Sequence, residues 1–212
     1  MKIIGHRGAL ALAEENTLLS FKAALHEGVD AIELDVRSSS DGVLVVHHDP
    51  SINNLTISKV PYHNLKASQP NLLTLKEALD YLRTRCPLII EIKKDTNLKV
   101  LTTEFKKLKL PAKGMIISSF HMPILLALRQ AFPDAALAVN EKWSGVRASR
   151  RARRLHTKYI TMNQRWLWSG FVKAVSKKGY KLSAYPLNDP AKAYRWKKHG
   201  LYGVITDSPD RF

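Results

Sequence analysis

Residues 31–36 read Ala-Ile-Glu-Leu-Asp-Val, and residues 88–93 read Leu-Ile-Ile-Glu-Ile-Lys. Both are short apolar runs, which are typical of the strands in repeated βα units. Both also carry acidic residues toward the C-terminal end of the run. These two stretches therefore predict a strand and, at its end, a polar site.

Similar short runs recur along the whole chain. The eight predicted strands span residues 2–5, 31–36, 88–93, 115–118, 135–139, 159–162, 181–185 and 203–206. Helical patterns with a period near 3.6 lie between them, at residues 17–27, 74–84, 98–108, 123–132, 147–155, 167–177 and 190–199. Eight βα units close into a barrel, so we predict an α/β fold, a single (β/α)8 barrel domain over residues 1–212. An open doubly wound sheet is the alternative.

Composition indicates an ordinary soluble domain. The 212 residues are 45% hydrophobic and 25% charged, and no apolar run approaches the roughly 20 residues that span a bilayer. The N-terminus lacks the apolar region of about 7–15 residues that marks a signal peptide, so we expect a cytoplasmic protein. Cys86 is the only cysteine, which excludes an intrachain disulfide.

Charge is distributed unevenly. Residues 106–212 hold 22 Lys and Arg against 5 Asp and Glu, whereas residues 1–105 hold 12 against 13. A basic run carries Arg147, Arg150, Arg151, Arg153, Arg154 and Lys158. Such a field suits an anionic partner, namely a phosphate ester, a membrane surface or nucleic acid.

Acidic residues mark the ends of the second and third predicted strands. Because residues i and i+2 of a strand share a face, Glu33 lies beside Asp35, and Glu91 beside Lys93. In a barrel, catalytic groups lie at the C-terminal ends of strands. Three converging carboxylates repel unless a cation binds them, and an all-oxygen set suits one divalent ion, Mg²⁺ or Ca²⁺.

The remaining strand ends supply the other groups of a phosphodiester-cleaving site. His6 and His48 are candidates for general acid and base. Arg7 and Lys93 are candidates to bind a phosphoryl oxygen. A metal, two histidines and two cations together favour phosphodiester hydrolysis.

A long ordered set of residues resembles the glycerophosphodiester phosphodiesterase family, in the phosphatidylinositol-phospholipase-C-like phosphodiesterase superfamily. The early block is His6-Arg7-Gly8, Glu15-Asn16-Thr17, Ile32-Glu33-Leu34-Asp35-Val36, Asp41-Gly42 and His48-Asp49. The later block is Thr74–Leu79, Ile90–Lys93, Ser118–Phe120 and Gly203–Pro209. The resemblance covers residues 3–209.

The resemblance implies a (β/α)8 barrel that hydrolyses glycerophosphodiesters to glycerol 3-phosphate and an alcohol. It implies metal ligands at Glu33, Asp35 and Glu91, with His6 and His48 as the acid/base pair. It also implies that a substrate hydroxyl attacks phosphorus first, which gives a cyclic phosphate that water then opens.

Some segments depart from the family pattern. Glu14 stands where the family usually has proline. Residues 50–73 have no strong core pattern, so we expect a reduced insertion after the second strand and a more open pocket. Tyr185 is expected to line the substrate site in place of the family's tryptophan.

Several residues have structural interpretations. Asn16 is predicted to be both a helix N-cap and a site residue. Asp207 is expected to hydrogen-bond its loop, and Trp166 and Trp168 to pack. The other histidines are expected at the surface, or, for His47, to point away from His48: His26, His47, His63, His121, His156 and His199.

Three alternatives to a soluble diesterase remain open. The first is a lysophospholipase D-like activity at an anionic membrane surface, contacted through Arg147–Lys158. The second is a barrel that binds phosphodiesters without turnover. The third, a nucleic-acid-binding protein, is disfavoured because no nucleic-acid-binding module is recognisable. The sequence leaves the oligomeric state undetermined.

Overall fold

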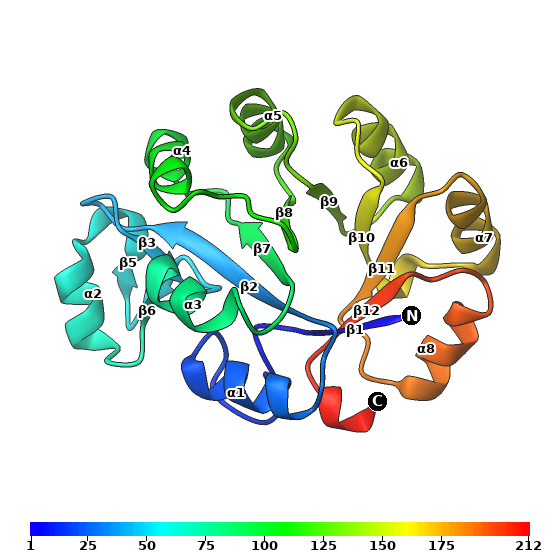
Figure 1. Cartoon of the computed structure of the whole chain (residues 1–212), viewed down its shortest axis with the longest axis horizontal. Coiled ribbons are helices and arrows are strands. Elements are labelled where there is room, and N and C mark those ends of the chain that lie inside the picture. The colour runs from blue at the N-terminus through cyan, green and yellow to red at the C-terminus, as the bar shows by residue number, and fades with distance from the viewer.

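A computed structural model describes all residues, 1–212, and contains a closed barrel of eight parallel strands (Figure 1). The barrel strands are β1 (Lys2–Gly5), β2 (Ala31–Ser38), β7 (Leu88–Ile92), β8 (Met115–Ser119), β9 (Leu137–Glu141), β10 (Tyr159–Asn163), β11 (Lys181–Tyr185) and β12 (Gly203–Thr206). β1 pairs with β12 on one side and β2 on the other, which closes the ring and excludes an open sheet. The predicted barrel is confirmed.

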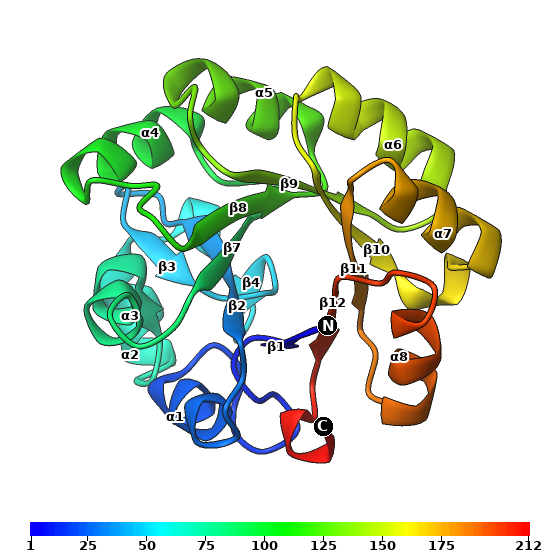
Figure 2. The same ribbon diagram turned by 45° about the vertical axis from the view of Figure 1, so that its right-hand side comes forward.

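Helices surround the strands (Figure 2). They are α1 (Leu18–His26), α3 (Leu75–Leu82), α4 (Leu98–Lys107), α5 (Met122–Ala131), α6 (Gly145–Arg154), α7 (Ser169–Lys177) and α8 (Pro190–Lys197). Short 3₁₀ turns follow β10 and β12, at Gln164–Trp166 and Pro209–Arg211. No helix combines the length and the apolar character needed to cross a membrane.

Reciprocal capping boxes fix where two of these helices begin. Thr17 and Ser20 form a reciprocal capping box at α1, and Thr74 and Glu77 form another at α3. The prediction that Asn16 caps α1 is wrong. Asn16 has a left-handed backbone (φ 58°), so its side chain turns away from the helix toward β2.

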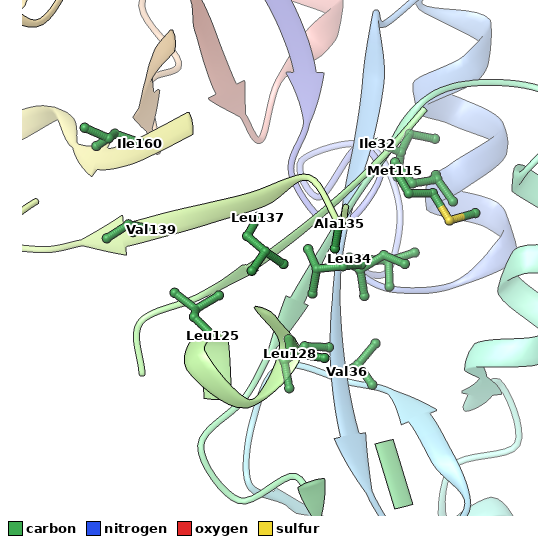
Figure 3. Close-up of a cluster of buried hydrophobic side chains, with 14 of the residues drawn as sticks. Ile32, Leu34, Val36, Met115, Leu125, Leu128, Ala135, Leu137, Val139 and Ile160 are labelled. Carbon is green, nitrogen blue, oxygen red and sulfur yellow. The ribbon is translucent and has the colours of Figure 1, made fainter. Parts of the chain in front are cut away.

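The main core lies between strands and helices, and it sets which strand residues face inward. Ile32, Leu34 and Val36 of β2 belong to this core and are drawn together in Figure 3. Because side chains alternate along a strand, Glu33 and Asp35 face the barrel interior. A smaller inner cluster that includes Ala31 and Ile89 fills the interior below them.

The segment between β2 and α3 forms a small subdomain. It contains β3 (Leu44–Val46), β4 (Ser51–Ile52), β5 (Leu55–Thr56), a 3₁₀ turn (Ile57–Lys59), α2 (Tyr62–Ser68) and β6 (Leu73–Thr74). β3 pairs antiparallel with the outer end of β2 and with β6. Although residues 50–73 show no strong core pattern in the sequence, four of them join Val45 in a separate buried apolar cluster, namely Ile52, Ile57, Leu65 and Leu72.

Candidate active site

Three carboxylates meet inside the barrel near the C-terminal ends of β2 and β7. Asp35 is in register with Glu91 on the neighbouring strand, and Glu33 lies two residues earlier on β2. One oxygen from each of the three lies within 4.8 Å of the others, and all three residues are buried. The structure thus brings together the predicted acidic cluster, Glu33, Asp35 and Glu91.

Burial makes this acidic cluster unfavourable without a cation. Burial, together with the charge of Asp35, raises the pKa of Glu33 to about 8. The ammonium of Lys93 lies 2.6 Å from Asp35 Oδ1 and also contacts Glu91. Arg7 Nε lies 3.3 Å from Asp35 Oδ2, and Asn16 Nδ2 donates to the same oxygen at 3.0 Å. These positive charges and donors only partly offset the repulsion.

The donor set fits a hard divalent cation. It consists of carboxylate oxygens, with no thiolate or imidazole among the three groups, and this chemistry suits Mg²⁺ or Ca²⁺ rather than Zn²⁺. Asn140 on β9 donates through Nδ2 to Glu91 at 3.0 Å, while its buried Oδ1 has no hydrogen-bond partner. Glu33, Asp35 and Glu91 are therefore the groups able to hold such an ion.

His6 follows β1 and is oriented by Asp207, which follows β12. The His6 Nδ1 atom lies 2.5 Å from Asp207 Oδ1, and Asn188 Nδ2 donates to the other oxygen at 2.8 Å. Burial opposes protonation of His6, but Asp207 and Glu33 favour it, and the net effect raises its pKa. Asp207 thus contacts a candidate catalytic group, His6, as well as Asn188 in the neighbouring loop. Its position directly after the eighth barrel strand is a signal that could have predicted the first contact.

His48 follows β3 and is held differently. Its Nδ1 atom lies 2.8 Å from Asp49 Oδ1, and burial together with Lys93 lowers its pKa. Arg37 donates from Nε to the His48 carbonyl oxygen at 3.0 Å and pairs with Asp95. Arg37 could not be found from the sequence, because its place at the outer end of β2 gave no chemical signal.

These groups line one cavity of about 840 Å³ at the C-terminal end of the barrel. Seven of the eight predicted site residues border it, namely His6, Arg7, Asp35, His48, Glu91, Lys93 and Tyr185. Glu33 lines the small space directly beneath. The Tyr185 hydroxyl donates to the Glu141 carbonyl oxygen at 3.3 Å, and its ring meets Phe120 edge-on.

The basic run divides between solvent and cavity. Arg147 Nε donates to Glu141 Oε2 at 2.7 Å, and Arg151 Nη1 donates to the same oxygen at 3.3 Å. Both arginines line the cavity, whereas Arg150 and Arg154 are exposed on α6. Burial would raise the pKa of Glu141, but hydrogen bonds and the two arginines lower it to about 2.

Two expectations about residues near this opening are wrong. His121 is half-buried and lines the cavity instead of lying free on the surface. Trp166 and Trp168 do not pack into the core but remain 48% and 64% exposed. Trp143, 60% exposed, contacts Trp166 edge-on with ring centroids 5.7 Å apart.

Comparisons with known proteins agree with this geometry. Residues 6–211 match the Glycerophosphoryl diester phosphodiesterase family. A glycerophosphodiester phosphodiesterase of Caldanaerobacter subterraneus is 27% identical, over 98% of this chain and 94% of that protein.

Solved structures agree as well. An Oleispira antarctica phosphodiesterase in complex with the product sn-glycerol-3-phosphate is similar, with a TM-score of 0.89 and 25% identity over 100% of this chain and 94% of that one. The Thermotoga maritima glycerophosphodiester phosphodiesterase gives a TM-score of 0.83 and 26% identity, over 99% of this chain and 96% of that one. The chain therefore belongs to the glycerophosphoryl diester phosphodiesterase family and is a phosphoric diester hydrolase.

Proposed function

We propose that residues 1–212 act as one catalytic domain that hydrolyses glycerophosphodiesters to glycerol 3-phosphate and an alcohol. The observation that carries this proposal is the buried acidic cluster beside two histidines and two cations in one cavity. The product named for the Oleispira antarctica structure supports the choice of substrate. Glu33, Asp35 and Glu91 would hold one Mg²⁺ or Ca²⁺ ion, which supplies positive charge to a phosphoryl oxygen.

The two histidines differ in a way that suggests their roles. In each, a carboxylate holds Nδ1, which leaves Nε2 for proton transfer. Asp207, the half-buried partner of His6, favours an imidazolium, so His6 suits the acid that protonates the leaving alcohol. The environment of His48 favours neutral imidazole, so His48 suits the base.

Proton transfer by these residues fits a two-step reaction. In the first step His48 takes the proton of a glycerol hydroxyl as its oxygen bonds to phosphorus, while the bond to the alcohol breaks and His6 protonates that alcohol. In the second step water opens the cyclic phosphate and the histidines exchange roles. Arg7 and Lys93 line the same cavity and would bind the phosphoryl oxygens. Failure to trap any cyclic phosphate in rapid-quench experiments would contradict this order.

The proposal is tested by release of glycerol 3-phosphate from glycerophosphocholine and glycerophosphoethanolamine. The assay is run with Mg²⁺, with Ca²⁺ and with chelator, for wild type, His6→Ala and His47→Ala. His47 is the matched control because it does not line the cavity. We expect metal-dependent release that only His6→Ala abolishes. Release that persists in excess chelator, or in His6→Ala, would refute the proposed chemistry.

The exposed tryptophans favour a second candidate function, cleavage of lysophospholipids at an anionic membrane surface. Trp143, Val146 and Trp166 lie on the loops that follow β9 and β10 and on the first turn of α6, and Val146 is 73% exposed. Tryptophan is enriched where proteins meet membrane interfaces. The adjacent basic run adds attraction to anionic lipid headgroups.

Vesicle sedimentation separates this candidate from action on soluble diesters. The protein is mixed with phosphatidylglycerol or phosphatidylcholine vesicles, as wild type, as Trp143→Ser/Trp166→Ser and as the control Tyr194→Ser on α8. Tyr194 is similarly exposed, at 47%. The candidate requires binding to phosphatidylglycerol vesicles that the double variant loses and the control keeps. Equal sedimentation with both kinds of vesicle, or no sedimentation with either, would exclude the membrane-surface function.

A further inference from the structure

The cavity contains a second set of positive groups that the proposed chemistry does not use. These groups, the basic rim, are Lys94, Lys142, Arg147 and Arg151. They come from the loop after β7 and from the loop and helix after β9. Arg7 and Lys93 already serve the phosphoryl group, so the basic rim is available to another part of the substrate.

The carboxylates that line the cavity are already engaged. Asp35 and Glu91 belong to the acidic cluster and contact Lys93. Asp95 pairs with Arg37, and Glu141 accepts from both Arg147 and Arg151. No lining carboxylate is therefore free to attract a quaternary or primary ammonium group.

The basic rim, by contrast, has unused donors. The Lys142 ammonium lies 5.4 Å from the centroid of the Phe120 ring and has no carboxylate within ion-pair distance. Lys94 is exposed at the cavity edge. Arg151 Nε is buried without a hydrogen-bond partner. After burial, the nearby charges of Lys94 and Arg151 further lower the pKa of His121, which also lines the cavity.

The basic rim lies close to the reaction centre. Asn140 donates to Glu91 at 3.0 Å, and the next residue on β9, Glu141, anchors Arg147 and Arg151. The Tyr185 hydroxyl, which donates to the Glu141 carbonyl oxygen at 3.3 Å, bridges the two parts of the cavity. The volume of about 840 Å³ falls in the range of sites for drug-sized ligands, so both parts can be occupied at once.

We propose that the basic rim is a subsite for the alcohol part of the diester and selects alcohols that carry a negative charge, such as a phosphomonoester. This inference rests on the proposed function, because it assigns the substrate class of the same site. Electrostatic complementarity favours an anionic alcohol, and like-charge contact disfavours choline or ethanolamine. The neutral glycerol part requires no such cations.

The test compares three diesters that share the glycerol 3-phosphate part. Their alcohols are choline, glycerol and glycerol phosphate, which are cationic, neutral and anionic. We expect kcat/KM to rise in that order, by on the order of tenfold from the first to the last, mostly through KM and more strongly at low salt. Equal kcat/KM for the three diesters, or a preference for choline, would overturn the subsite.

Variants locate the effect on the rim. Lys94→Gln/Lys142→Gln removes two ammonium groups but keeps the Glu141 ion pairs. It should lower several-fold the ratio of kcat/KM for the glycerol phosphate diester to kcat/KM for the choline diester. The control Lys113→Gln removes an exposed charge before β8, at the opposite end of the barrel, and should keep the wild-type ratio. A double variant that retains the wild-type ratio would overturn the assignment to the rim.

A binding measurement separates failure of this inference from failure of the proposed function. The same three diesters are titrated calorimetrically into the metal-loaded wild type and the double variant. If affinity rises from the choline to the glycerol to the glycerol phosphate diester but none is hydrolysed, the proposed function is refuted and the subsite still stands. If the diesters are hydrolysed but neither affinity nor kcat/KM depends on the charge of the alcohol, only the subsite is refuted.

Discussion

At the scale of single residues, the site depends on groups that orient the reactive ones. Asp207 holds His6 at 2.5 Å, and Arg37 holds the His48 carbonyl oxygen. The contact with Asp207 fixes the tautomer and the direction of the His6 imidazole, whereas the contact with Arg37 holds the backbone that carries His48. Small changes at such residues should therefore alter the chemistry more than the stability.

Asp207→Asn should lower kcat by about 10- to 100-fold, by analogy with other groups that orient a functional histidine. Asp207 helps to raise the pKa of His6, so the variant should have a lower His6 pKa. If His6 acts as the acid, activity falls as pH rises through that pKa, and the alkaline limb of the kcat profile should move to lower pH. The pH profile of wild type, Asp207→Asn and the exposed control Asp210→Asn checks this. An unshifted alkaline limb in Asp207→Asn would contradict the acid role.

Glu33→Gln should stabilise the metal-free protein. The raised pKa of Glu33, about 8, means that folding is opposed by its charge, increasingly as pH rises from about 4.5 to 8. In chelator at pH 8 we expect a gain of about 1–3 kcal/mol, and almost none at pH 5. Added Mg²⁺ or Ca²⁺ should raise the melting temperature of wild type but not of the variant.

Thermal unfolding with and without metal measures both effects. Glu27→Gln, at the exposed end of α1, is the control and should behave as wild type. A variant that is less stable than wild type in chelator at pH 8 would show that the acidic cluster is not strained.

At the scale of elements, the subdomain after β2 positions His48. β3 ends directly before His47, and the Ile57 amide donates to the Pro50 carbonyl oxygen at 3.0 Å. The separate apolar cluster of this subdomain therefore supports His48, one half of the proposed acid/base pair. The predicted strands and helices also match the structure closely at this scale, because barrel strands and their helices have strong local patterns.

Leu65→Ala, in the subdomain cluster, should cost about 2–5 kcal/mol and also lower kcat several-fold, because His48 loses its support. Leu128→Ala on α5 is the control, since Leu128 is equally buried but lies in the main core. Urea unfolding measures the stability of both variants, and kcat is measured without urea at a temperature well below unfolding, so that loss of folded protein does not affect it. Equal kcat in both variants would mean that the subdomain does not position His48.

Much of the site could be predicted from sequence, since strand ends in a barrel converge by geometry alone. The same reasoning missed Asn140 and Glu141, because the predicted strand 135–139 ends two residues before the end of β9. It could not find the cavity-facing side of the basic run, because those contacts depend on side-chain direction on a helix. It misplaced the N-cap of α1 by one residue, since both Asn16 and Thr17 are good caps. It also missed the subdomain core, whose five residues are spread between positions 45 and 72.

At the scale of the whole molecule, the excess of basic residues lies in the second half of the sequence, but both halves contribute charged residues to the same cavity. The second half has 22 basic and 5 acidic residues, and its cations Lys142, Arg147 and Arg151 border the cavity. The first half supplies the acidic cluster and His6. We therefore expect a long-range field to draw an anionic diester toward the cavity before it reaches the site.

Ionic strength should therefore affect catalysis. Raising salt from about 0.02 to 0.2 M shortens the screening length from roughly 20 to 7 Å, so kcat/KM for an anionic diester should fall several-fold while kcat changes little. Steady-state kinetics in NaCl checks this, with choline chloride as a second salt. A kcat/KM that is independent of both salts would contradict steering.

The most direct test of the central claim is a crystal structure with Mn²⁺ and glycerol 3-phosphate. Our account predicts one anomalous peak bound by Glu33, Asp35 and Glu91, at roughly 2.0–2.4 Å from a carboxylate oxygen of each, with a phosphate oxygen completing the site. The His6 and His48 Nε2 atoms should face the phosphate. No peak at the acidic cluster, or a phosphate bound away from it, would contradict the proposed metal-assisted hydrolysis.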